Sequence, residues 1–141
     1  MKDINDEGRT SLAVNRRLLL ACLFLLAIIG TTYYYLDNRS EIRQILWIAI
    51  SITWYTAIGF SIIKIFGKKK IGYLIAGIIS WTTLAFWMLD NWYVVFHHTI
   101  IAAKPDYIMT VRNFVGAGIA VLGILSSHNA FNKIKNKTKL I

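Results

Sequence analysis

The chain has 141 residues, of which 56% are hydrophobic and 16% are charged, and its formal net charge is +9. A soluble domain of this size needs more charged residues on its surface and fewer hydrophobic ones. The composition therefore predicts one integral membrane domain. The basic excess does not indicate a nucleic-acid partner, because the Lys and Arg residues stand at the ends of apolar runs instead of sharing one solvated face.

The chain begins with a polar segment of mixed charge, residues 1–17, which we expect to be cytoplasmic. Residues 18–36 then run without a charge and end in three tyrosines. At about 1.5 Å per residue this stretch crosses a hydrocarbon layer of roughly 30 Å. A cleaved signal peptide is the alternative interpretation, but bulky tyrosines stand where a cleavage site needs small residues. We therefore expect an uncleaved transmembrane helix.

Three further apolar stretches follow, and each is long enough to cross the membrane. They predict helices over residues 45–66, 71–96 and 107–131, with a basic cytoplasmic tail over residues 132–141. The second and third stretches are joined by a short turn with three lysines, Lys68–Lys70, which favours a helical hairpin. The predicted fold is all-α, a bundle of four transmembrane helices spanning residues 18–131.

The distribution of Lys and Arg predicts the orientation. Four lie within residues 1–17, three in the turn at Lys68–Lys70 and four in the tail, whereas the other side has only Arg39, Arg43 and Lys104. Because Lys and Arg are enriched in cytoplasmic loops, both termini are expected in the cytoplasm, with the protein in a bacterial inner membrane.

Three ionisable residues form a predicted cluster near the outer face. Charges inside a membrane are costly and tend to face the bundle interior. Asp90 and His97 follow the same helical stripe of the third helix, and Arg112 lies at the outer end of the fourth. An ion pair that locks the two helices is the preferred interpretation. The alternative is a proton- or anion-binding site in which His97 changes its charge near neutral pH.

A stripe of small residues follows three- and four-residue steps on each of these two helices, which is typical of closely packed membrane helices. We call these seven residues the small-residue seam: Gly72, Ala76, Ser80, Gly116, Ala120, Gly123 and Ser127.

Neither a metal site nor a cofactor site is predicted. Cys22 is the single cysteine, and the adjacent His97 and His98 would point about 100° apart on a helix, so they could not bind one ion from the same face. The remaining histidine, His128, lies toward the opposite membrane face. Because no catalytic motif is recognisable either, the chain is predicted not to be an enzyme.

Three functional hypotheses remain open. The preferred one is a non-enzymatic protein that contacts a membrane partner, or a second copy of itself, through its helices, either as an accessory subunit or as an immunity or exclusion factor. The second is a self-associating, holin-type pore, which would need a polar stripe along one helix. The third is a small-solute or proton-linked carrier that uses Asp90, His97 and Arg112.

Overall fold

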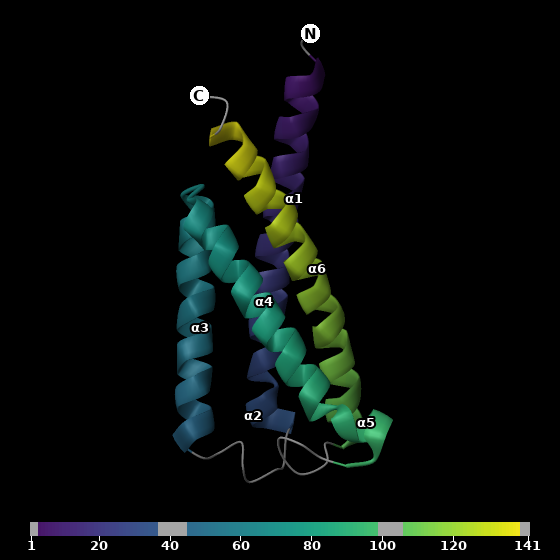
Figure 1. The fold of residues 1–141 in the computed structure, drawn as a ribbon. Coiled ribbons are helices and arrows are strands. Elements are labelled where there is room, and N and C mark those ends of the chain that lie inside the picture. The colour runs from purple at the N-terminus through teal and green to yellow at the C-terminus, as the bar shows by residue number, and fades with distance from the viewer. Residues whose placement is uncertain (1–2, 37–44, 99–105, 139–141) are drawn as a thin grey trace.

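The computed structural model describes residues 3–36, 45–98 and 106–138, and Figure 1 shows that these segments are almost entirely helical. The helices are α1 (Asp3–Thr31), α2 (Tyr33–Leu36), α3 (Ile45–Phe66), α4 (Lys70–Asp90), α5 (Trp92–Phe96) and α6 (Tyr107–Thr138). The start of α1, the end of α6 and the turn between α3 and α4 all lie toward one end of the molecule (Figure 1). We call this the terminal end and the opposite one the distal end.

Within the described residues, four stretches are long and apolar enough to cross a membrane: Thr10–Leu36, Ile45–Phe66, Lys70–Asp90 and Tyr107–Lys135. The predicted all-α class with four such helices is therefore confirmed. The orientation of the termini stays a prediction.

The first and last helices extend beyond the apolar stretches that predicted them. α1 begins at Asp3, inside the polar segment 1–17, and α6 continues to Thr138, inside the tail 132–141. The predicted bounds followed the ends of the apolar stretches. A helix can continue through polar residues, because its ends are set by capping residues, glycine and proline. The two segments are therefore largely extensions of α1 and α6.

The third predicted helix, residues 71–96, is interrupted in the structure. α4 ends at Asp90, Asn91 has φ −88° and ψ 7°, and the short α5 follows from Trp92. The side chain of Asn91 is bonded to α6, because its Nδ2 donates to the carbonyl of Thr110 at 3.3 Å. The prediction of one continuous helix was wrong, because hydropathy does not detect an asparagine that is held by a neighbouring helix.

α4 is the central helix of the bundle and crosses it diagonally (Figure 1). Its most extensive contacts are with α6, and it also packs against α3, mainly toward the terminal end. α1 packs against α6 and makes only slight contact with α3. The neighbours therefore follow the order α3, α4, α6, α1, and the gap between α1 and α3 is the least closed.

α4 and α6 approach closely because large and small residues alternate across their interface. The indole of Trp87 covers Gly116 so tightly that a Cβ atom there would overlap it. A Cβ atom on Gly123 would lie 2.5 Å from the Ser80 Oγ, and one on Gly77 would lie 2.7 Å from the Ser127 Oγ. Positions rise along one helix as they fall along the other, so the two helices are antiparallel.

All seven residues of the small-residue seam are buried in the structure. Those of α6 face α1 and α4, and Gly72 faces α3, where a Cβ atom would come within 2.7 Å of the backbone nitrogen of Ile65. Ser61 of α3 reinforces this approach by donating to the Gly72 carbonyl at 2.8 Å. The seam is thus used for contacts within the chain.

Candidate functional site

The carboxylate of Asp90 lies inside the bundle at the last residue of α4, and the residue is only 6% exposed. Its Oδ2 accepts a hydrogen bond of 2.9 Å from the Tyr33 hydroxyl and one of 2.7 Å from the Asn113 Nδ2. Tyr33 belongs to α2 and Asn113 to α6. One carboxylate therefore joins three parts of the chain that are far apart in sequence.

Asn113 is fully buried and connects both charges. Its Oδ1 accepts from the Arg112 Nε at 3.2 Å and from the Arg112 Nη2, while its Nδ2 donates to Asp90 and, at 3.1 Å, to the Asn91 Oδ1. The guanidinium of Arg112 also stacks over the Tyr33 ring, 3.5 Å from its centroid. Charged groups at this depth need such partners, because leaving one unsatisfied costs several kcal/mol, on the order of its desolvation. We call Tyr33, Asp90, Asn91, Arg112 and Asn113 the polar network.

A break in the first helix places Tyr33 in this network. The hydroxyls of Thr31 and Thr32 donate to backbone carbonyls in the preceding turn, at Ala27 and Ile29 respectively. Such bonds compete with the helical ladder and bend helices. α1 ends at Thr31 and α2 begins at Tyr33, whose side chain is buried.

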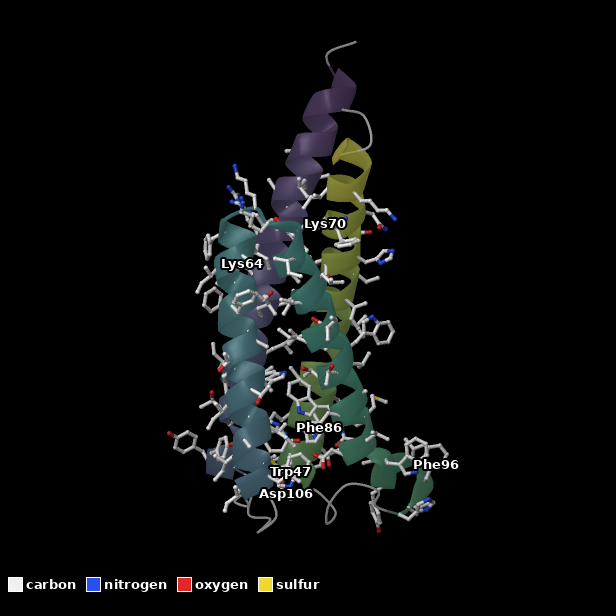
Figure 2. All side chains as sticks on the ribbon, turned by 60° about the vertical axis from the view of Figure 1, so that its left-hand side comes forward. Trp47, Lys64, Lys70, Phe86, Phe96 and Asp106 are labelled. Atoms are coloured by element: carbon white, nitrogen blue, oxygen red, sulfur yellow. The ribbon has the colours of Figure 1, made fainter. Side chains whose placement is uncertain are left out.

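A cleft of about 160 Å³ opens beside the network, between α1, α2, α3 and α4. Its lining is mainly aromatic, and among the described residues that form it only Asp90 is charged: Gly30, Tyr33, Tyr34, Trp47, Ile50, Ser51, Trp54, Tyr55, Thr82, Thr83, Phe86, Trp87 and Asp90. Figure 2 shows Trp47 and Phe86 close together at the distal end. Their rings meet edge to face, with centroids 5.5 Å apart. We call this the aromatic cleft.

One hydrogen bond fixes the wall between α3 and α4. The Trp54 indole nitrogen donates to the Thr83 hydroxyl at 2.9 Å. On the other side of the cleft, α2 and α1 are joined to α3 by two further contacts: the Tyr34 hydroxyl donates to the Ser51 Oγ at 2.7 Å, and the Thr31 and Tyr55 hydroxyls are hydrogen-bonded at 2.9 Å.

The structure brings Asp90 and Arg112 into one network but leaves His97 outside it. His97 follows α5, is exposed, has φ 61° and contacts the Tyr93 ring, with centroids 6.2 Å apart. Figure 2 shows the neighbouring Phe96 well to the side of the bundle. The expected proximity of His97 was wrong, because the interruption at Asn91 ends the helical stripe that linked it to Asp90.

Sequence reasoning missed Tyr33, Asn91 and Asn113. Tyr33 looks like a residue of the interfacial aromatic belt, and Asn91 looks like part of a loop. Asn113 did have a signal: it precedes Gly116 by three residues and therefore continues the stripe of α6 as well as Arg112 does.

The site combines a paired set of buried polar groups with an apolar cleft. Its carboxylate and guanidinium already share the Asn113 side chain, and the aromatic walls offer apolar surface with a few hydroxyl groups. In the described segments, no group of three or more His, Cys, Asp or Glu side chains is placed to hold a metal ion. Comparison with known protein families, with curated proteins and with solved structures finds no match for the chain.

Proposed function

We propose that this chain is a non-enzymatic membrane protein that binds a transmembrane helix of another membrane protein, with a bulky side chain of that helix seated in the aromatic cleft. Such a protein would act as an accessory subunit or as an immunity or exclusion factor. We also propose that both termini are cytoplasmic and that the membrane is the bacterial inner membrane, which the Lys and Arg distribution supports.

The aromatic cleft is the observation on which the proposal rests. A volume of about 160 Å³ is close to that of an apolar cavity that accommodates one benzene ring. It therefore suits a single aromatic or large aliphatic side chain. Anchors of this kind dominate the energetics of protein interfaces.

The exposure of α3 supports the same proposal. Only 11% of its most apolar window is buried inside the protein, against 39% for α4 and for α6. Most of the α3 surface is therefore available to a neighbour, whereas the small-residue seam is already covered within the chain. A partner helix lying along α3 would reach the cleft at Ile50, which is 47% exposed.

The pore hypothesis has less support. The polar side chains that would line a channel, Ser80, Thr83 and Asp90, are buried inside the single chain. A pore between copies would need these groups on an outer face.

Photocrosslinking in native membranes tests the proposal. A benzophenone amino acid at Ile50 is compared with one at Val115, which is 54% exposed on α6 away from the cleft. We expect a protein adduct of one defined mass from Ile50 alone, whose partner is then identified and purified. Ser51→Trp, which fills the cleft, should weaken binding of the purified partner at least about tenfold, and Val115→Trp should leave it unchanged. Equal adducts at both positions, or lipid adducts alone, would refute the proposal.

A further inference from the structure

Basic side chains gather at the terminal end from three separate parts of the chain. They come from α1, from the α3–α4 turn and from the end of α6: Arg16, Arg17, Lys68, Lys69, Lys70, Lys133 and Lys135. Figure 2 shows Lys70 and, on α3, Lys64 toward this end.

Two contacts bring these basic groups around the same helix ends. The Lys70 Nζ lies 4.6 Å from the centroid of the Phe131 ring, which joins the start of α4 to α6. The Lys133 ammonium donates to the Ser11 hydroxyl, which joins the end of α6 to α1. Charges from α1, α4 and α6 therefore surround one region.

Arg16 points toward the interior of this region. It lies four residues after Leu12 and three before Leu19, and both leucines pack in the core near Tyr73 of α4. Arg16 thus projects from the core-facing side of α1, unlike Arg17, which is exposed.

The Arg16 Nε is buried and has no hydrogen-bond partner among the described residues. Buried guanidinium donors are almost always satisfied, because a missing acceptor costs the desolvation free energy of the N–H group. Arg16 as a whole is half-buried, and it is its Nε that lies inside the protein. Within the described residues no acceptor is hydrogen-bonded to this N–H, so an anionic acceptor from outside the chain would satisfy it.

We propose that the phosphate of an anionic phospholipid, from the leaflet at the terminal end, binds Arg16 between α1 and the start of α4, with Lys70 as a second donor. A phosphate offers the planar pair of acceptor oxygens that a guanidinium recognises. Basic pockets between membrane helices on the cytoplasmic side are suited to anionic headgroups. The binding of a partner helix at the distal end does not depend on this site.

The test uses the full chain in nanodiscs of phosphatidylcholine with increasing amounts of phosphatidylglycerol. The thermal unfolding midpoint and the phosphatidylglycerol molecules retained in native mass spectrometry are both measured. The wild-type midpoint should rise with phosphatidylglycerol. Arg16→Gln should lower the affinity for this lipid about tenfold, whereas Arg17→Gln, with the same change in charge, should retain it.

Two additions keep the result decisive. Arg16→Lys preserves the charge but not the planar donor pair, so this variant should bind phosphatidylglycerol more weakly than the wild type. It provides a test of the site if Arg16→Gln does not fold. Inorganic phosphate in phosphatidylcholine nanodiscs should leave the midpoint unchanged. Equal losses for Arg16→Gln and Arg17→Gln, wild-type binding by Arg16→Lys, or a phosphate effect as large as that of the lipid would each overturn the proposal.

Discussion

At the scale of single residues, the decisive one is Asn113, which hydrogen-bonds to both Asp90 and Arg112. The sequence indicates that the two charges meet, because each lies on the inward stripe of neighbouring helices. It does not indicate that an amide bridges them, or that the Tyr33 ring lies under the guanidinium. These contacts depend on the break after Thr31 and on the rotamers of buried side chains. A hydropathy pattern predicts neither of these.

The charges of the polar network should be interdependent. Asp90→Asn and Arg112→Gln should each lower the free energy of unfolding by about 3 kcal/mol, because each leaves the other charge buried without its counterpart. The double variant should lose clearly less than the sum of the two. A double-mutant cycle from unfolding in detergent measures this coupling, and strict additivity would show that the charges are independent.

At the scale of helices, the α4–α6 interface depends on the absence of particular Cβ atoms. α6 has glycines at 116, 118 and 123, and the structure distinguishes among them: Gly116 is covered by Trp87, whereas a Cβ atom on Gly118 would meet nothing within 4 Å. The seam was identifiable from residue spacing. That Trp87 fills the space above Gly116 was not, because a tryptophan in an apolar stretch is equally compatible with a lipid-facing position.

Gly116→Ala and Gly118→Ala form a matched pair on this helix. Both gain the same helix propensity, about 1 kcal/mol, so the difference between them isolates packing. Gly116→Ala should be less stable than Gly118→Ala by about 1–3 kcal/mol, the cost of overpacking against Trp87. Thermal unfolding of the purified variants gives the comparison. Equal stability would mean that α4 and α6 are farther apart than described.

At the scale of the whole molecule, hydropathy was sufficient to find the four long helices. The length and the apolar content of a membrane-crossing stretch depend only on the residues of that stretch. It could not give the order α3, α4, α6, α1, since no local pattern shows that the first and last helices pack together. It also could not give the helix ends at Asp3 and Thr138, where the helical backbone continues through polar residues.

Reporter fusions test the orientation of the whole chain. Fusions after Asn38, Lys69 and Lys104 should report the periplasm, the cytoplasm and the periplasm in turn, because Lys and Arg concentrate on the side of Lys69 and the termini. Asn38 and Lys104 lie outside the described residues, so these fusions provide information that the structure does not. A periplasmic signal after Lys69 would reverse the proposed orientation.

The packing of α1 against α6 has a consequence for biosynthesis. The ribosome makes α1 first and α6 last, so α1 enters the membrane long before its principal neighbour exists. Asp90 is likewise inserted before Arg112 and Asn113, which complete its surroundings. A nascent chain that ends before residue 107 therefore has an uncovered face on α1 and a carboxylate without its α6 partners. Membrane chaperones should bind such intermediates, and quality-control proteases should degrade them. Insertion of α6 should then cover the α1 face and give the Asp90 carboxylate its partners.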